Sequence, residues 1–455
     1  MRLNPLLIAT IVLALLGGLV WYTREHPPES DDAAPSVVDL EEDQIAEVTV
    51  EREGEEPITL VRGDGDGDSW EFGGSMGLRA DGSSVGLLVS SLASLNAERI
   101  VSENVVEWGP YGLSEPSLSV AFKHEAGSGK LLFGRDTPTG SGVFARLEGD
   151  PRLFTVYSYN KTSLDKSAFD LRDKRLLSLD EDSISSIAVE TPGRSLAFER
   201  VDGEWSIVRP LPLRTDDFSA GDLARVVRTA EMTEVLAVDD SGAYSFANPL
   251  ATIRVVDGEA THELVLAEDG DTHYARSSDQ PGVYAVSETL AEGFDKDVEE
   301  FRNKKLFDFG FLDPARVSVR IGDLDAVVAR SEGVWKLESQ GGREVSGEKV
   351  QTLLDRLRNL SATAFPSDDA SAQASYGLDD PAVRVIVEPS GEDSVPETVL
   401  IAATDRSPAY AAREGEPSTY EVEQSAVLDI DRAVADVVEQ EADAPEPEQE
   451  EDAGE

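Results

Sequence analysis

The chain has 455 residues, and at roughly 150 residues per domain this length suggests about three domains. Its 90 acidic residues outnumber 40 basic ones, and the net charge of −50 argues against binding to the phosphates of DNA or RNA. The absence of cysteine excludes a disulfide framework, a thiolate nucleophile and a Cys-ligated metal. Solubility, a saline exterior and a basic partner are all consistent with the acidity.

The N-terminus carries the clearest targeting signal. Residues 6–22 are uncharged, and a helix of that length just spans a hydrocarbon layer of ~30 Å. Trp21 and Tyr22 stand where an interfacial aromatic belt is expected. We therefore expect residues 1–22 to be a transmembrane anchor of the bacterial inner membrane, with a cleaved signal peptide as the alternative. The body then faces the periplasm or exterior, after an acidic, proline-containing linker at residues 23–37.

Three tandem modules are expected next, at residues 38–176, 177–306 and 307–436. Each opens with the apolar–polar alternation of a strand and reaches a polar turn. A strand holding a tryptophan, here called the Trp strand, follows the turn. The tryptophans lie 135 and 130 residues apart, at Trp70, Trp205 and Trp335.

Each Trp strand is followed by a predicted amphipathic helix. Its apolar residues recur at the i, i+3, i+4 and i+7 spacing that places them on one helix face. Aspartate and serine side chains just before these residues are candidate N-caps, because their oxygens accept backbone N–H bonds. The candidates are Asp81 or Ser83, Asp217 or Ser219, and Ser346; the apolar faces are Val85, Leu88, Val89, Leu92 and Leu95; Leu223, Val226, Val227 and Ala230; and Val350, Leu353, Leu354, Leu357 and Leu360.

A corner with a tyrosine and, five residues later, a proline follows each helix. The sequences are residues 111–116, 244–249 and 376–381, and each proline leads into a further strand. The first two modules end in matching basic runs, residues 171–176 and 301–306, which we call the first and second exit segments. The simpler interpretation of these segments is a charged helix end or an intermodule salt bridge, and the alternative is a docking patch for an acidic partner.

The predicted fold class is α+β: three tandem repeated modules, each an antiparallel sheet with one covering helix, after the N-terminal transmembrane helix. Residues 437–455 are rich in acidic residues, carry no lysine or arginine and are expected to be a disordered tail.

Candidate chemistry is sparse, and we predict no catalytic, cofactor-binding or metal-ligating residue and no cofactor. Aspartates alternate with glycines at residues 64–68, but the calcium-loop pattern is incomplete and an acidic hairpin turn fits better. None of the histidines recurs at an equivalent place in another module; they are His26, His124, His262 and His273. The repeated tryptophans and the corner residues Tyr111, Tyr244 and Tyr376 are expected to pack rather than to form binding platforms.

The anchor, the Trp strand, the Leu-rich helix and the Tyr-Gly-Leu-x-x-Pro corner together resemble an uncharacterised bacterial domain-of-unknown-function family. Its members are encoded beside gliding-motility-type ABC transporter components. The resemblance covers about residues 38–436, and residues 245–246 depart from its corner motif. It implies a non-enzymatic, membrane-anchored interaction or scaffold protein with protein partners in such a transporter complex. An extracytoplasmic glycan- or peptide-binding module is the alternative, and an enzyme with an unrecognised carboxylate site is a weaker one.

Overall fold

The computed structural model describes residues 35–63, 69–74, 78–138, 140–238, 242–391, 395–405 and 407–439. The predicted anchor at residues 1–22, the aspartates at residues 64–68 and most of the acidic tail lie outside these ranges. In the part of the chain that is described, no helix is long and apolar enough to cross a membrane. The chain divides into two compact units, residues 1–175 and 176–455.

The first unit contains one antiparallel sheet, and its order is β3-β2-β1-β5-β6-β7-β8-β4. Alternating burial along β1 matches the period of two read from the sequence, so one face of this strand is in the core. The strands are β1 Ile45–Arg52, β2 Ile58–Arg62, β3 Trp70–Phe72, β4 Arg99–Ser102, β5 Leu118–His124, β6 Gly127–Asp136, β7 Gly142–Leu147 and β8 Leu153–Tyr157.

The second unit contains two sheets with the same strand permutation, in the orders β11-β10-β9-β13-β14-β15-β16-β12 and β20-β19-β18-β17-β22-β23-β24-β25-β21. The third sheet differs by one extra edge strand, β20. Its strands are β17 Arg316–Ile321, β18 Leu324–Ser331, β19 Val334–Leu337, β20 Arg343–Glu344, β21 Ala362–Ser367, β22 Val383–Glu388, β23 Glu397–Ile401, β24 Ala409–Arg413 and β25 Thr419–Val422. Those of the second sheet are β9 Ile184–Thr191, β10 Arg194–Val201, β11 Glu204–Arg209, β12 Glu234–Ala237, β13 Ala251–Asp257, β14 Ala260–Asp269, β15 Thr272–Ser277 and β16 Val283–Ala285.

These three sheets confirm the predicted α+β fold class, with one sheet for each of the three repeated modules. Short 3₁₀ turns connect several elements: η1 Glu42–Gln44, η2 Gly109–Tyr111, η3 Val298–Phe301, η4 Glu338–Gln340 and η5 Ala370–Tyr376.

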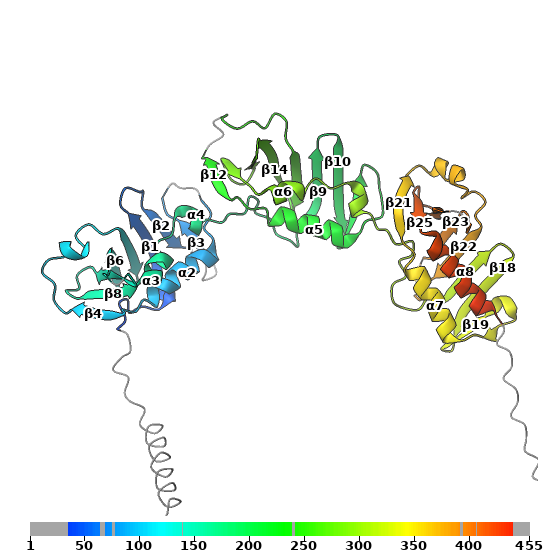
Figure 1. Ribbon diagram of the computed structural model, residues 1–455, viewed down its shortest axis with the longest axis horizontal. Helices are drawn as coiled ribbons and strands as arrows, with labels where there is room; N and C mark the ends of the chain where they lie inside the picture. Colours follow the sequence, from blue (N-terminus) through cyan, green and yellow to red (C-terminus); the bar gives the residue numbers. More distant parts are fainter. Residues whose placement is uncertain are drawn as a thin grey trace, which may run out of the picture. The chain divides into compact units, whose positions relative to one another are not determined.

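One helix follows each Trp strand, as predicted: α2 Gly82–Ala93, α5 Asp217–Arg228 and α7 Gly347–Arg358 (Figure 1). The Asp81 carboxylate caps α2 by accepting the N–H of Ser84 at 2.7 Å. The predicted cap of α5 was wrong: Asp216 caps it through Ser219, while Asp217 instead accepts the backbone N–H of Trp205. Residue 217 is therefore used to tie the helix to its Trp strand.

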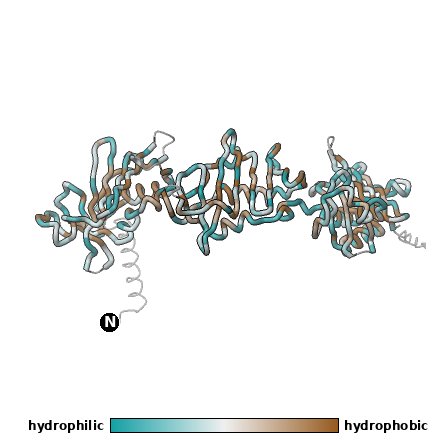
Figure 2. The backbone as a smooth tube through the Cα atoms, turned by 90° about the horizontal axis from the view of Figure 1, so that it is seen from above, coloured by the Kyte–Doolittle hydropathy of each residue, from teal (hydrophilic) through white to brown (hydrophobic). Residues whose placement is uncertain are grey.

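The apolar helix faces and the alternating strand faces form the cores. In Figure 2 brown, hydrophobic segments lie along the strands, and many of the turns are teal. In the first unit Val85, Leu88 and Leu92 of α2 pack in one cluster with Val48 and Leu60 of the sheet. The tryptophans are 6, 7 and 6% exposed, so the prediction that they pack in the cores is confirmed at Trp70, Trp205 and Trp335. Burial of such apolar area is the main stabilising contribution to each module.

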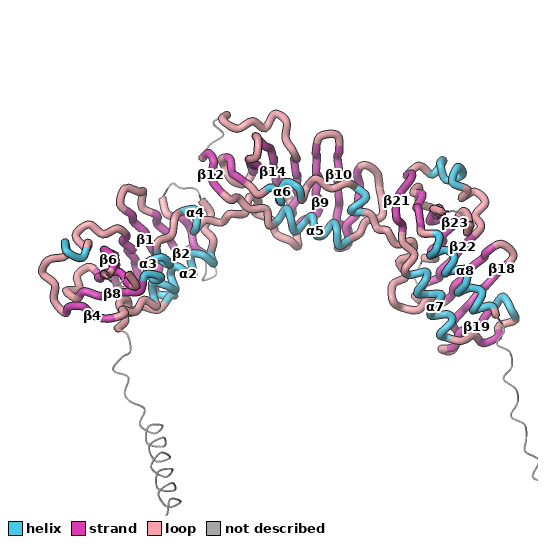
Figure 3. Tube along the Cα trace, in the orientation of Figure 1, coloured by secondary structure: helices cyan, strands magenta, loops and turns pink. Residues whose placement is uncertain are grey.

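The sequence did not indicate the second helical region that ends each module (Figure 3). It is short in the first two modules, formed by α3 Ser158–Leu164 and α4 Ala168–Leu171, and by α6 Glu288–Glu292 with η3. In the third module one helix, α8 Gln424–Val438, packs beside α7 and buries Val427, Ile430 and Val434. This helix continues past residue 436, where the expected tail begins.

The extended segment at the start of the first module occupies the position that the second exit segment occupies in the third module. Residues 35–38 pair with the end of α2, because Val37 donates to Leu95 and Ala97 donates to Pro35, both at 2.9 Å. At the equivalent place in the third module Leu306 donates to Leu360 at 3.0 Å and Ala362 donates to Lys304 at 2.7 Å. Each of these modules therefore receives an extended segment beside the C-terminus of its long helix.

Candidate functional site: the junction of the second and third modules

The second exit segment is an extended strand that pairs with two modules in succession. On one side, Asp216 donates to Phe301 at 2.8 Å and Asn303 donates to Arg214 at 2.9 Å, which places the strand beside the second module. Residues 304–306 then pair with the third module through the bonds of Leu306 and Ala362. Because one short strand contributes backbone bonds to both modules, it joins them directly.

Arg302 is the centre of this junction. Its side chain is 3% exposed, and its guanidinium bonds the two oxygens of Asp368 at 2.7 and 3.0 Å. It also bonds the Ser418 hydroxyl at 2.8 Å and lies 3.6 Å from the ring centre of Phe365. A buried arginine requires such partners, since an unpaired buried charge is costly. For this exit segment the intermodule salt bridge is confirmed.

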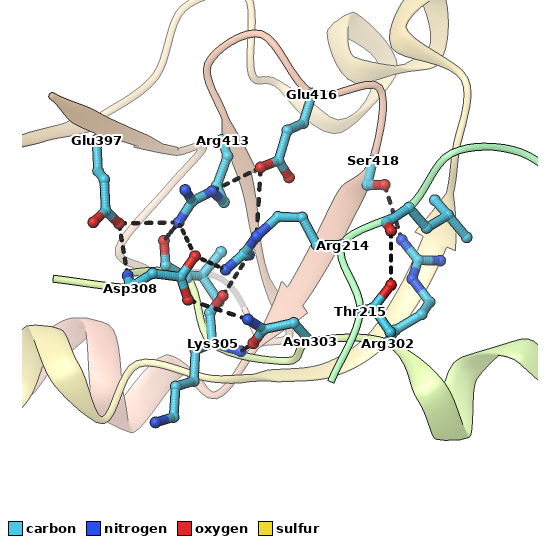
Figure 4. Close-up of polar contacts among 12 residues, drawn as sticks. Arg214, Thr215, Arg302, Asn303, Lys305, Asp308, Glu397, Arg413, Glu416 and Ser418 are labelled. Carbon is cyan, nitrogen blue, oxygen red and sulfur yellow. Dashed lines mark hydrogen bonds and ion pairs between the residues drawn. The ribbon is translucent and has the colours of Figure 1, made fainter. Parts of the chain in front are cut away.

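A second charged group surrounds Arg214, which precedes the helix cap of α5 (Figure 4). Arg214 pairs with Asp308, lies 3.6 Å from Glu416 and donates to the Lys305 carbonyl at 2.6 Å. On the opposite side Arg413 pairs with Glu416 at 2.8 Å, with Glu397 at 3.2 Å and with the Leu306 carbonyl. Glu397 in turn accepts the N–H of Asp308 at 2.7 Å. The group therefore fixes the chain where it enters the third module.

The electrostatics of this group follow from partial burial. Burial acts against the charge of Arg214, but the carboxylates of Asp308 and Glu416 outweigh it, so the pKa of Arg214 is raised. Burial and the nearby Glu416 carboxylate raise the pKa of the Tyr420 phenol to about 12. Tyr420 donates to Glu416 at 2.5 Å, so its neutral form is the one that the junction holds.

A cleft of about 1350 Å³ opens at this junction. Trp205 and Leu213 contribute apolar wall, Arg302 and Arg358 contribute cations, and Asp308 and Glu416 contribute carboxylates. Each of these four charged side chains already has an opposite charge within 4 Å. The arrangement is suited to holding two modules together.

The residues considered as catalytic or metal-binding in the sequence are dispersed. His26 and residues 64–68 lie outside the described part of the chain. His124 stacks on Phe122 at 6.4 Å between ring centres, and His273 lies 3.7 Å from Glu268. Among the described residues, no group of three or more His, Cys, Asp or Glu side chains is placed to hold a metal ion.

His262 has a partner that sequence reasoning missed. Its Nδ1 lies 2.8 Å from an oxygen of Asp279, and both side chains are largely buried. The same carboxylate accepts the backbone N–H of Ser178 and the hydroxyl of Ser278 at 2.7 Å each. Burial opposes the carboxylate charge, but these bonds outweigh it and lower the pKa of Asp279. Asp279 thus fastens the start of the second module, as Glu397 does in the third.

The corner tyrosines each contact an aromatic ring on a strand of their own sheet. The ring centres are 5.1 Å apart for Tyr111 and Phe144, 5.2 Å for Tyr244 and Tyr274, and 4.8 Å for Tyr376 and Tyr410. This recurring pair supports packing as their role. Gly112 and Gly377 have φ values of 73° and 81°, a region that glycine adopts without strain.

A repeated motif before the helix could have indicated Arg214 from the sequence. Residues 78–81 read Leu-Arg-Ala-Asp and residues 213–216 read Leu-Arg-Thr-Asp, again 135 residues apart. In both modules the arginine bonds a carbonyl of the exit segment, from Arg79 to Arg175 and from Arg214 to Lys305, at 2.6 Å. In the third module Glu344 stands at this position, directly after Arg343 and two residues before Ser346, the N-cap of α7.

Comparison with known proteins gives a family but no function. No curated protein matches the chain, and no solved structure matches it. The family model described as Domain of unknown function (DUF4340) matches three times, over residues 70–249, 205–344 and 335–449. The three matches begin at Trp70, Trp205 and Trp335, the same residues that mark the repeat, and together they cover most of the sequence. The chain therefore belongs to the DUF4340 family.

Proposed function

We propose that this protein is a non-enzymatic, membrane-anchored extracytoplasmic interaction protein, accessory to an ABC-type transporter complex of the gliding-motility-like class. The uncharged residues 6–22 support the membrane anchor, and the resemblance carried by the repeat motifs supports the transporter association. The contacts made by the charged side chains in the fold support an interaction role.

The observation that carries the proposal is the junction built by Arg302. Its guanidinium and the neighbouring Arg214 and Arg413 are committed to carboxylates and carbonyls of the adjoining module. An enzyme would keep a positioned acid, base or nucleophile accessible to its substrate. Here the same groups hold successive modules in register, which is what a scaffold with several binding faces requires.

Crosslinking of the tagged full-length chain in native membranes, followed by mass spectrometry, tests this proposal. We expect crosslinks between the modules and the permease or ATPase subunits of a transporter. An unrelated single-pass membrane protein with the same tag serves as the control. Recovery of transporter subunits at the level of this control would contradict the proposal.

A second candidate function is glycan binding, and one surface feature favours it. Tyr157 and Tyr159 stack with ring centres 5.5 Å apart and planes at 11°, and they are 43 and 65% exposed. Flat exposed aromatic faces are suited to contact with the apolar faces of sugars. A glycan array probed with the full chain and with Tyr159→Ala tests this candidate: binding lost in the variant, with unchanged thermal unfolding, supports it, and absence of binding contradicts it.

A further inference from the structure

Among the described residues, the third module has no counterpart of a strand that the other two modules possess. In the first module, the N–H of Asp81 donates to Leu171 at 2.9 Å, and the N–H of Asp173 donates to Arg79 at 2.8 Å. The second module repeats both bonds between residues 214–216 and 301–303. In each case an exit segment covers the outer edge of the short strand that lies between the Trp strand and the helix.

At the equivalent edge of the third module, β20 is the outermost strand of its sheet. Val345 donates to Trp335 at 3.0 Å, so the backbone groups of Glu344 and Ser346 point the other way, away from β19. Within the described ranges, neither the Glu344 carbonyl nor the Ser346 N–H has a hydrogen-bond partner. These two groups correspond to the ones that bond the exit segments in the first two modules.

In the third module the C-terminal helix stands in the place of an exit segment. In place of a short turn and an extended strand, α8 stays helical to Val438. Arg343 then donates to the Val438 carbonyl at 2.7 Å. The sequence after residue 439 carries no lysine, arginine or large apolar residue and includes Pro445 and Pro447, so it does not resemble an exit segment.

The chemistry of the missing strand can be read from the exit segments. Both have a buried apolar residue, Leu171 or Phe301, followed within five residues by three basic ones. The position that is Arg79 or Arg214 in the first two modules is the exposed Glu344 in the third. Glu348 is exposed four residues further along the chain, Lys336 lies opposite Glu344 on β19, and Glu338 pairs with Arg316 at 3.0 Å. The change from arginine to glutamate at this one position favours a basic strand.

We propose that the β20 edge of the third module binds an extended, basic segment of a partner protein by strand addition, in the place that the exit segments occupy in the other modules. The inference deepens the proposed interaction role, because it gives the partner a chemistry and a position. Main-chain bonds to Glu344 and Ser346 supply the pairing, and Glu344 selects positive charge.

A synthetic peptide with the sequence of residues 300–307 is a suitable probe, and its binding to the full-length chain is measured by fluorescence anisotropy. We expect saturable binding. The control peptide carries an N-methyl group on the residue equivalent to Asn303, whose N–H bonds Arg214 in the chain. It keeps every charge but cannot pair, so it separates strand addition from simple attraction to a chain of net charge −50. We expect it to bind at least about tenfold more weakly.

Two variants at one position test the same bond from the protein side. Ser346 has φ −55° and its side chain makes no cap bond, so Ser346→Pro fits the backbone and removes only the N–H. Ser346→Ala keeps that N–H and is the matched control. We expect the proline variant to lose about tenfold in peptide affinity and the alanine variant to keep it. Glu344→Arg restores the residue type of the other modules. At low salt it is expected to lower the affinity for the peptide.

Equal binding of the N-methyl peptide, equal binding to Ser346→Pro, or no binding would each overturn the inference. Binding that appears only after removal of residues 440–455 would also overturn it, because the chain's own C-terminal residues would then cover the edge. Transporter crosslinks do not depend on these bonds. Failure of the peptide test with crosslinks intact therefore removes this inference and leaves the proposed function standing.

Discussion

The second and third modules share a strand permutation but finish in different ways. After its last strand, β16, the second module makes the short helix α6, a turn and the extended second exit segment. The third module makes a single helix, α8, of 15 residues. The second exit segment therefore pairs with the third module as well as with its own. In the third sheet, β20 is the outermost of the described strands.

The local sequence accounts for this difference. Gly293 follows α6 directly, and glycine lowers helix stability, so the helix ends there and Phe294 turns back into the core. Residues 424–438 contain neither glycine nor proline, and their apolar residues keep the helical spacing. A few residues after the last strand of a module thus decide whether the chain forms an extended exit segment or one long helix.

The largest expected effect comes from removing the buried apolar residue of the second exit segment. Phe301 is 1% exposed and packs edge-on against Phe198, with ring centres 4.9 Å apart. Phe301→Ala is expected to lower the free energy of unfolding of the second module by about 3–5 kcal/mol, because it leaves a cavity. Urea unfolding measures this, and Phe311→Ala, at a side chain 97% exposed, is the control. Equal effects of the two changes would show that the exit segment is not part of the core.

The next largest effect concerns Arg302, which joins the two modules. Arg302→Ala removes the cation beside Asp368, which then keeps only the bond from the Ser418 hydroxyl, and is expected to cost about 3 kcal/mol. A double-mutant cycle with Asp368→Ala should give a coupling energy of about 1–3 kcal/mol. The exposed pair of Arg225 and Asp222 is the control, with an expected value below about 1 kcal/mol. A coupling energy near zero at Arg302 would mean that the modules are held together by other contacts.

Repeated apolar patterns were enough to predict the three sheets and the helix that follows each Trp strand, because burial is periodic in sequence, whereas α8 was not predicted. The residues of the junction were not predicted, since Arg302, Asp368 and Ser418 are up to 116 residues apart and meet only in the folded chain. The wrong cap at α5 has a similar cause. Three polar residues, Asp216, Asp217 and Ser219, were eligible, and the contact of Asp217 with Trp205 decided between them.

At neutral pH a smaller effect is expected at Tyr420, and a larger one develops at high pH. Its pKa is about 12 in the folded chain against an ordinary value near 10. The unfolded chain loses this proton first, so stability is intact below pH ~10 and falls as the pH rises to ~12, by up to about 3 kcal/mol. Tyr420→Phe should remove this part of the decline and cost about 1 kcal/mol at pH 7 through the lost bond to Glu416. Urea unfolding at a series of pH values tests this, and identical slopes for both proteins above pH ~10 would contradict it.

The smallest expected changes in stability come from substitutions in the tyrosine–proline corners. Gly112 and Gly377 both have positive φ, but a Cβ at Gly112 would lie 2.7 Å from Cγ of Arg135 and 3.0 Å from its backbone nitrogen, whereas at Gly377 the nearest atom is 3.5 Å away. Gly377→Ala is expected to cost about 1 kcal/mol for the backbone conformation alone, and Gly112→Ala about 2 kcal/mol because the neighbour must also move. Ser245, at the same place in the second module, is not among the positive-φ residues, so Ser245→Gly should bring no gain. If urea unfolding gave equal costs at the two glycines, the close approach of the first corner to β6 would contribute nothing, and the three corners would differ only in sequence.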